Sequence, residues 1–258
     1  MTKFYLLILF SLFKTTFGVQ LPAYIEKCHF GDSKCLVRSI NDFVRNYPKN
    51  AAEIGLPTLD AINVKDVSVP EKPNDAPIYL SFYFTNNVYK GFNNATITHV
   101  TGFNKNPTKD QIEIQARIPS LVHEATYHMQ GRYLLFVANT TDKLLSDYQN
   151  LQLTITIKIT LEYRNNKRYL KIYELVPKAD LDRWIVWMDN LYRENTDLTI
   201  ALNHIMNEHW VEFWNGVEPT ILKNIATCLE GMLSKFFETV SYDDMFLPVE
   251  IWNESSDY

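Results

Sequence analysis

The sequence LQLTITIKITL, residues 151–161, alternates apolar and polar residues without a break. Its odd-numbered positions hold Leu or Ile, and its even-numbered positions hold Gln, Thr or Lys. Successive side chains of a strand point to opposite faces, so this period of two predicts a β-strand with one apolar and one polar face. At roughly 3.3 Å per residue the strand spans about 36 Å, longer than a usual strand. Its apolar face therefore needs an equally long partner.

Further stretches of the same kind surround this strand. They are rich in β-branched and aromatic residues, and short turns join them. Asn165 and Asn166 favour a tight hairpin after the opening strand, because Asn tolerates positive φ. Consecutive strands with short connections predict an antiparallel sheet. The stretches are 78–84, 95–103, 111–118, 126–137 and 168–176.

Helical patterns flank the strands. Residues 32–48 predict an amphipathic helix that Asp32 or Ser33 caps and Pro48 ends. The segment 55–70, between this helix and the first strand, is rich in Pro and turn residues, and we expect no regular element there.

The C-terminal region carries two helical apolar stripes. The first runs from Leu198 to Trp214, and we expect Gly216 and Pro219 to break it. The second, 221–237, is about as long as the opening strand, so the two can lie along each other. The pattern predicts one α+β domain over residues 19–258.

The N-terminus, MTKFYLLILFSLFKTTFG, predicts a signal peptide over residues 1–18, because its apolar run is too short to cross a bilayer. We therefore expect a secreted, extracellular protein without stable membrane insertion. Removing Lys3 and Lys14 changes the formal charge from −5 to −7. A chain this acidic, without a cluster of Lys and Arg, is not expected to bind nucleic acid or anionic membranes.

Cysteines and glycosylation motifs agree with secretion. Cys28 and Cys35 enclose a short turn and are expected to form a disulfide in an oxidising compartment. Cys228 lies on the second apolar stripe, which favours a buried structural thiol over a reactive one. Candidate N-glycosylation sites are Asn94, Asn139 and Asn253.

No sequence pattern indicates catalysis, a cofactor or a metal site. HEATYH, residues 123–128, resembles a zinc motif, but on a strand His123 and His128 point to opposite faces. His204 and Glu208 are one helical turn apart, which favours a surface pair, and His209 is expected in the core or a groove. The sequence contains no G-x-S-x-G or phosphate-binding glycine motif. We therefore expect a protein that is not an enzyme.

Several motifs together resemble the insect takeout and juvenile-hormone-binding family. The N-terminal cysteine pair and helix precede them in the order that the family has. The matching motifs are Gly55-Leu56-Pro57-Thr58-Leu59-Asp60, Tyr127-x-x-x-Gly131, Leu191-Tyr192, Leu202-Asn203, Met206-Asn207-Glu208-His209-Trp210 and Tyr242-Asp243-Asp244-Met245-Phe246. The chain departs from the family at Ala61 and in VANTTDK, residues 137–143, and Cys228 alone cannot form the second disulfide of the hormone-binding branch. The chain is thus more similar to the takeout branch.

This resemblance implies a fold in which a long α-helix is wrapped by a strongly curved antiparallel β-sheet that encloses an apolar tunnel. The implied function is a secreted carrier for a small hydrophobic ligand, such as a juvenile-hormone-like terpenoid or a fatty-acid-like lipid. Candidates for the tunnel wall are Leu36, Ile40, Phe43, Tyr127, Tyr133, Ile155, Ile157, Ile159, Trp210, Phe213 and Trp214. We expect a monomer, and a receptor is a further candidate partner that no motif identifies.

One alternative remains open from the sequence. Periodicity does not distinguish a hollow interior from one that side chains fill. A secreted protein-interaction module with a filled core would show the same alternation and the same helical stripes.

Overall fold

The computed structural model describes residues 19–46, 49, 52–69, 78–133, 136–193 and 195–248. The predicted signal peptide and the glycosylation motif at Asn253 lie outside these residues.

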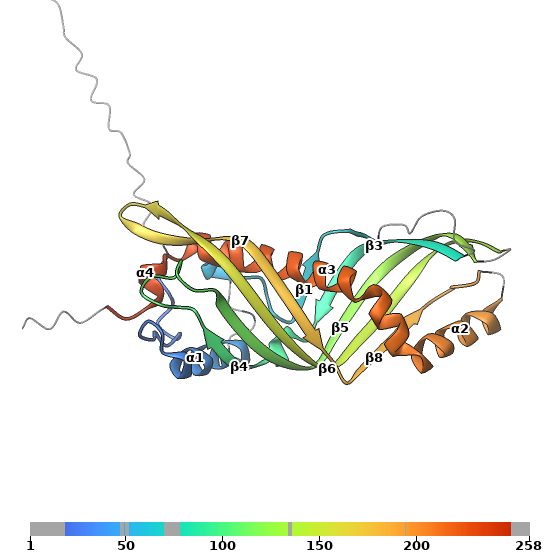
Figure 1. The fold of residues 1–258 in the computed structure, drawn as a ribbon, viewed down its shortest axis with the longest axis horizontal. Helices are drawn as coiled ribbons and strands as arrows, with labels where there is room; N and C mark the ends of the chain where they lie inside the picture. The colour runs from blue at the N-terminus through green and yellow to red at the C-terminus, as the bar shows by residue number, and fades with distance from the viewer. Residues whose placement is uncertain are drawn as a thin grey trace, which may run out of the picture.

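Within the described part of the chain, eight strands form one antiparallel sheet that does not close on itself (Figure 1). Its main path is β1-β3-β5-β6-β7, and β2, β4 and β8 pair with β3, β5 and β6. The sheet and the long C-terminal helix confirm the predicted α+β class. The strands are β1 (Ala61–Val64), β2 (Val67–Val69), β3 (Ile78–Lys90), β4 (Thr96–Thr101), β5 (Ile112–Tyr133), β6 (Phe136–Arg164), β7 (Lys167–Asp180) and β8 (Arg183–Met188).

The opening stretch 151–161 belongs to β6, a strand of 29 residues. Leu151, Leu153, Ile155, Ile157 and Ile159 are all buried, as the alternation predicts. The strand is longer than expected because the chain before residue 151 continues the same pairing with β5. Two stretches that looked separate, 111–118 and 126–137, likewise belong largely to the single strand β5.

Both long strands change character at the same place. Buried side chains occupy Ile118 and then Leu121 on β5, and Tyr148 and then Leu151 on β6, so the alternation shifts by one residue on each. Asn150 adopts a φ of 50° there. At this point β6 exchanges its partner, because residues 144–149 pair with β8 and residues 152–164 pair with β7.

The partner exchange divides the molecule into two halves. The α1 half contains β4, β7 and the paired segments 112–118 and 151–164. The α2 half contains β3, β8 and the remaining parts of β5 and β6. Figure 1 shows α3 running along the sheet through both halves, with α1 and α4 at one end and α2 at the other.

The described helices cover one side of this sheet and its ends. Asp32 caps α1 by accepting a hydrogen bond from the Cys35 amide at 3.0 Å, as predicted for the first helix. The described helices are α1 (Ser33–Asn46), the short 3₁₀ helices η1 (Ala52–Ile54) and η2 (Phe92–Asn94), α2 (Thr196–Glu208), α3 (Trp210–Thr239) and α4 (Tyr242–Met245).

The predicted break at Gly216 and Pro219 is wrong, because Pro219 lies inside α3. Because Pro219 has no N–H, the Asn215 carbonyl has no helical hydrogen-bond donor. Asn215 is exposed, so water can donate to this carbonyl instead. The chain breaks instead at His209, between α2 and α3, with φ −104° and ψ 36°. His209 itself is exposed. The expectation that it lies in the core or a groove is therefore wrong.

Two more expectations about local structure are wrong. The segment 55–70, where we expect no regular element, contains the strands β1 and β2, because both pair with β3 and gain ladder hydrogen bonds from it. The apolar stripe of the first C-terminal helix is also not its buried face. Ile205 and Phe213 are exposed by 48% and 41%, whereas Thr199 and Asn203 are buried. The buried face is polar because it faces the backbone of the edge strand β8.

The hairpin between β6 and β7 is held against α4. Asn165 and Asn166 have φ of 50° and 62°, which confirms the predicted tight turn. Lys167 Nζ lies 2.6 Å from Asp244 Oδ2, and Arg168 donates to Asp243 from its Nε, its Nη2 and its backbone amide. These contacts fix the C-terminal end of the described chain over the α1 half.

Candidate ligand-binding site

The α1 half encloses an apolar cavity of about 260 Å³. The sheet forms one wall, with inward side chains of β4, β5 and β6, and α3 forms the opposite wall. Ala116 and Ile155 lie on the sheet side, and Leu229 and Phe236 lie on the α3 side. Helix α1 packs mainly on β4, where the Asn41 side chain accepts from the Ile97 amide at 2.8 Å and donates to the Ile97 carbonyl at 2.9 Å. The cavity lies between α1, α3 and the sheet.

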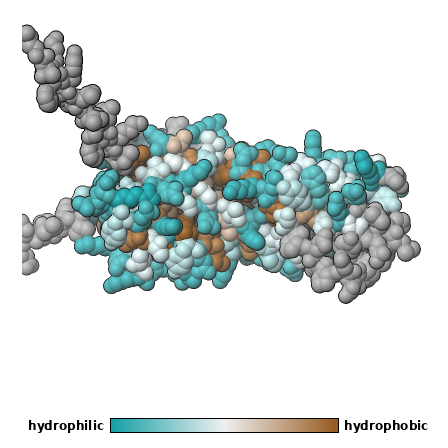
Figure 2. Space-filling view, turned by 90° about the horizontal axis from the view of Figure 1, so that it is seen from above, coloured by the Kyte–Doolittle hydropathy of each residue, from teal (hydrophilic) through white to brown (hydrophobic). Residues whose placement is uncertain are grey.

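The cavity reaches the surface beside α1. Lining residues from the sheet are nearly all buried, whereas Leu36, Ile40, Phe43, Met232 and Phe236 on the two helices are only half-buried. Seen from above in Figure 2, the surface is mostly hydrophilic, with apolar patches between the hydrophilic side chains. The mouth therefore lies between α1, α3 and the N-terminal segment.

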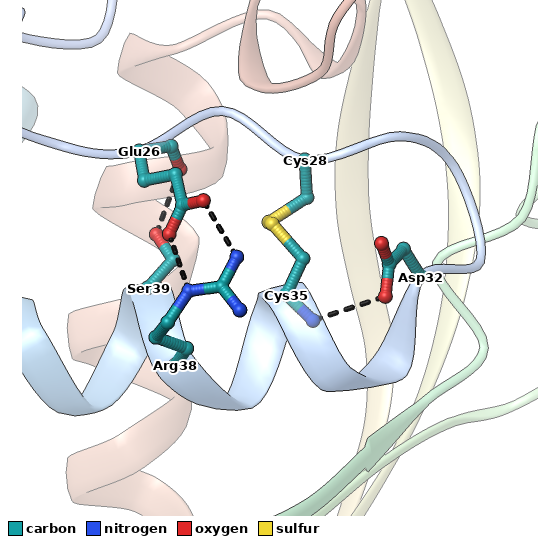
Figure 3. The surroundings of a disulfide bond; sticks show 6 residues. All are labelled: Glu26, Cys28, Asp32, Cys35, Arg38 and Ser39. Carbon is teal, nitrogen blue, oxygen red and sulfur yellow. Dashed lines mark hydrogen bonds and ion pairs between the residues drawn. A yellow bond between two sulfur atoms is a disulfide. The ribbon is translucent and has the colours of Figure 1, made fainter.

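Polar groups at the mouth already have partners in the protein (Figure 3). Ser39 Oγ donates to the Glu26 carbonyl at 2.7 Å, and Arg38 makes two hydrogen bonds to the Glu26 carboxylate, at 2.6 and 2.9 Å. The hydrogen bonds from Arg38 lower the pKa of Glu26, so the pair stays ionised and mutually neutralised. Among the described residues that line the cavity, none offers an unpaired charge to a ligand.

The Cys28–Cys35 disulfide is confirmed and lies at this mouth, with 5.7 Å between the two Cα atoms (Figure 3). It ties the first turn of α1 to the N-terminal segment, and Cys28 itself lines the cavity. Leu247 N donates to the Cys28 carbonyl at 2.9 Å, so the same point is also joined to the chain after α4. The disulfide thus fixes one edge of the opening.

Aromatic residues close the end of the cavity beside α4. Phe246 lines the cavity and stacks on Phe30 with 4.5 Å between ring centroids. Tyr242 contacts the edge of the Phe246 ring and donates to the Asn104 carbonyl at 2.7 Å. The closing motif of the sequence therefore builds this end wall.

Next to the cavity, described aromatic and polar side chains lie in the interior of the α2 half. Trp214 meets Tyr148 and Trp184 edge-on, each at 5.9 Å between centroids. His123 is 5% exposed and stacks on Tyr89 at 4.4 Å, and burial lowers its pKa to about 4. The cavity ends before these residues.

The structure brings four of the predicted wall residues together on the cavity. They are Leu36, Ile40, Phe43 and Ile155.

The remaining predicted wall residues lie elsewhere. Ile157 and Ile159 are buried in the core beyond the cavity, and Trp214 packs in the α2 half. Tyr127 is fully buried there and donates to the Asp189 carbonyl. Trp210 lies under the Arg183 guanidinium, Phe213 is exposed, and the side chain of Tyr133 lies outside the described part.

The α3 wall was missed as part of the site. Leu229, Met232, Leu233 and Phe236 all line the cavity, and they belong to the predicted stripe 221–237. The helical period was therefore a usable signal for the inward face. It could not tell which part of that face meets a cavity and which part meets side chains.

The isolated titratable groups do not assemble into a reactive site. His123 is inside the sheet and His128 is on its outer face, where it lies 2.9 Å from Thr141 Oγ1. Cys228 is buried, and burial raises the pKa of its thiol to about 12, as expected for a structural cysteine. His204 and Glu208 form an exposed pair at 3.6 Å. The residues that the structure describes contain no group of three side chains suited to hold a metal ion.

The sequence of the chain matches a known family and two known proteins. Residues 5–247 match the model of the family described as haemolymph juvenile hormone binding protein. The chain is 19% identical over 228 residues to the circadian clock-controlled protein daywake of Drosophila yakuba, covering 87% of this chain and 88% of that protein. The daywake protein of Drosophila melanogaster is 18% identical over the same length, with the same coverage.

A solved structure has the same fold. The crystal structure of Takeout 1 from Epiphyas postvittana superposes with a TM-score of 0.71 at 16% identity, covering 84% of this chain and 97% of that one. In the described part of the present chain, no helix is both long and apolar enough to span a membrane.

Proposed function

Because the chain belongs to the haemolymph juvenile hormone binding protein family, we propose that it is a secreted carrier that holds a small hydrophobic ligand in the cavity of the α1 half. The observation that carries this proposal is the cavity itself. It is lined almost wholly by apolar side chains, it opens at one side, and its polar rim is internally paired. Such a site binds by removing apolar surface from water rather than by chemistry on the ligand.

The cavity volume suits a slender ligand. An apolar cavity of about 150 Å³ accepts benzene, so 260 Å³ gives room for about ten ligand carbon atoms. Burial of about ten methylene groups contributes about 8 kcal/mol before the cost of immobilising the ligand. A terpenoid like juvenile hormone or a fatty-acid-like lipid could place part of its chain here, with its more polar end at the mouth.

Secretion is the second part of the proposal. The predicted signal peptide over residues 1–18 would direct the chain out of the cell, and the remaining residues 19–258 would act as one carrier domain. The disulfide is compatible with an oxidising compartment. Asn94 and Asn139 are exposed, so both could accept a glycan. We further propose that the carrier works as a monomer and delivers its ligand to a receptor.

A matched pair of substitutions on β5 tests the carrier proposal. Ala116 is on the cavity wall, and Ala125 is equally buried on the same strand but in the α2 half, away from this cavity, at 8% and 7% exposure. A phenyl ring needs about 150 Å³, more than half of the 260 Å³, so Ala116→Phe should weaken binding of decanol at least about tenfold. Calorimetric titration with decanol measures this affinity.

The control should show the opposite pattern. Ala125 is buried and does not line the cavity, so Ala125→Phe should cost about 1 to 3 kcal/mol of stability and leave the decanol affinity of the folded protein unchanged. Absence of decanol binding to the parent would overturn the carrier proposal. Such a result would favour a protein-interaction module instead.

A further inference from the structure

A layer of fully buried side chains crosses the interior where the cavity ends. On β5 the cavity wall ends at Ile118, and the layer continues with Leu121. On β6 the wall ends at Leu153, and the layer continues toward the α2 half with Leu151 and with Tyr148, the direct partner of Leu121. On α3, Ile225 lies one turn before the wall residue Leu229. We call this the central layer, and its members are Tyr89, Leu121, Tyr148, Leu151 and Ile225, each exposed by 1% or less.

Tyr89 is placed to be the main barrier within this layer. Its ring lies 6.5 Å from that of Phe92, which is on the cavity wall, and 4.4 Å from the stacked ring of His123, which is in the α2 half. Tyr89 is exposed by only 1%, so other side chains surround its ring. The phenol ring thus lies between a wall residue of the cavity and the interior of the α2 half.

From this geometry we infer that the central layer, and Tyr89 above all, selects ligands by length. The inference rests on the proposed carrier function. The site takes an uncharged lipid whose buried chain has about ten carbon atoms, since the 260 Å³ cavity has room for no more and its rim has no unpaired charge among the described residues. A longer chain must leave its additional methylenes in the mouth, exposed to water.

Chain-length dependence of affinity tests this selection. Each newly buried methylene strengthens binding about fourfold, whereas a methylene that stays in water adds nothing. Calorimetric titration with octanol, decanol, dodecanol and hexadecanol should therefore show affinity rising from octanol to decanol and then levelling off in the parent. Tyr89→Ala adds the space of a phenol ring at the inner end, so hexadecanol should bind that variant at least about tenfold more tightly than it binds the parent.

Three further variants separate selection from general damage. Tyr89→Phe keeps the ring and should keep the parental length profile. Leu151→Ala opens the same layer from β6 and should also extend the profile, which covers the case in which Tyr89→Ala does not fold. Leu170→Ala makes a hole in a buried site of β7 that is 2% exposed and does not line the cavity, and it should leave the profile unchanged.

The outcomes distinguish this inference from the carrier proposal. If the parent fails to bind decanol, the carrier proposal itself fails. If decanol binds but affinity continues to rise fourfold per methylene up to hexadecanol, the central layer does not limit length. Folded Tyr89→Ala and Leu151→Ala proteins with the parental profile would overturn the inference while leaving the carrier function intact.

Discussion

The side-chain amide of Asn203 pairs with the backbone of Met188 in the way that a neighbouring strand would. Its Oδ1 accepts from the Met188 amide at 2.9 Å, and its Nδ2 donates to the Met188 carbonyl at 2.8 Å. One helical turn later, Asn207 makes the same pair of hydrogen bonds to Val186, at 2.9 and 2.6 Å. Helix α2 therefore takes the place of a neighbouring strand at the edge of β8, and it protects an edge that could otherwise pair with another chain.

Loss of the Asn203 amide should destabilise this edge. Asn203 is fully buried, so Asn203→Ala leaves the Met188 amide and carbonyl without partners and should cost about 2 to 4 kcal/mol in urea unfolding. Asn203→Asp has nearly the same shape but cannot donate to the Met188 carbonyl, and it should also destabilise. The exposed neighbour His204→Ala is the control. Equal stability of all three variants would show that the amide pairing has no energetic role.

Ile155 and Ile157 have the same orientation on β6, yet they should respond differently to enlargement. Ile155 is on the cavity wall, so Ile155→Trp should displace ligand and weaken decanol binding. Ile157 is fully buried between its cross-strand partners Ile112 and Leu175, so Ile157→Trp should cost about 1 to 3 kcal/mol and leave binding unchanged.

Thermal unfolding and calorimetric titration measure both effects. Thr156→Val, on the outer face between these two residues, is the control and should change neither quantity by much. If Ile157→Trp abolished decanol binding without a loss of stability, the cavity would extend further along β6 than its observed wall.

This pair also shows how far sequence reasoning reaches. Alternation correctly predicts that Ile155 and Ile157 point inward, because the side-chain period of a strand is set by its backbone. It cannot predict that one meets a cavity and the other meets side chains, since that depends on how α1 and α3 pack over the sheet. The packing of elements that are distant in the sequence decides whether an inward side chain meets a cavity or other side chains.

The same limit explains the errors in the helical region. The apolar stripe through Ile205 predicts a buried face, but the backbone of β8 requires amide partners, and Asn203 and Asn207 therefore turn inward. The motifs Leu202-Asn203 and Met206-Asn207 can be read from the sequence. The sequence does not show that β8 is an edge strand whose backbone needs these Asn side chains as hydrogen-bond partners. By contrast, the turn at Asn165 and Asn166 and the cap at Asp32 depend on local geometry and were predicted correctly.

His123 should make stability depend on pH. Asn87 donates from Nδ2 to the carbonyls of Lys65 and Phe84, so its Oδ1 accepts from His123 Nε2, at 3.0 Å. Burial lowers the pKa of His123 to about 4 in the folded state, against about 6.5 in the unfolded state. The unfolded state thus binds more protons between these values, and the contribution of neutral His123 is complete above about pH 6.5 and is lost as the pH falls toward 4.

The expected loss is about 2 kcal/mol between about pH 7 and about pH 5. His123→Gln keeps an N–H donor for Asn87 but does not titrate, so urea unfolding of this variant should lose that much less stability over the same interval. Parallel pH profiles for the parent and His123→Gln would contradict the assignment of the effect to this side chain.

The disulfide should affect ligand release more than global folding. It closes a loop of sequence separation 7, and so short a loop contributes only about 2 kcal/mol in the chain-entropy model. Because Cys28 and α1 form the mouth, the double change Cys28→Ser with Cys35→Ser should speed dissociation of decanol, measured by NMR exchange, while the melting temperature falls modestly.

Cys228→Ser is the matched control, since Cys228 is buried, forms no disulfide and lies outside the mouth. It should leave the dissociation rate unchanged. A collapsed unfolding transition in the double variant, with an unaltered rate, would assign the disulfide to stability rather than to the mouth.

The location of a bound chain tests the carrier account most directly. A crystal structure with decanol brominated at its terminal methyl group would place the bromine by anomalous scattering. If the chain is a carrier, the bromine should lie inside the α1 half, near Ala116 and Leu229, with the hydroxyl toward Ser39 at the mouth. Bromine found instead on the exposed apolar face of α2, or an empty cavity at a saturating concentration, would contradict it.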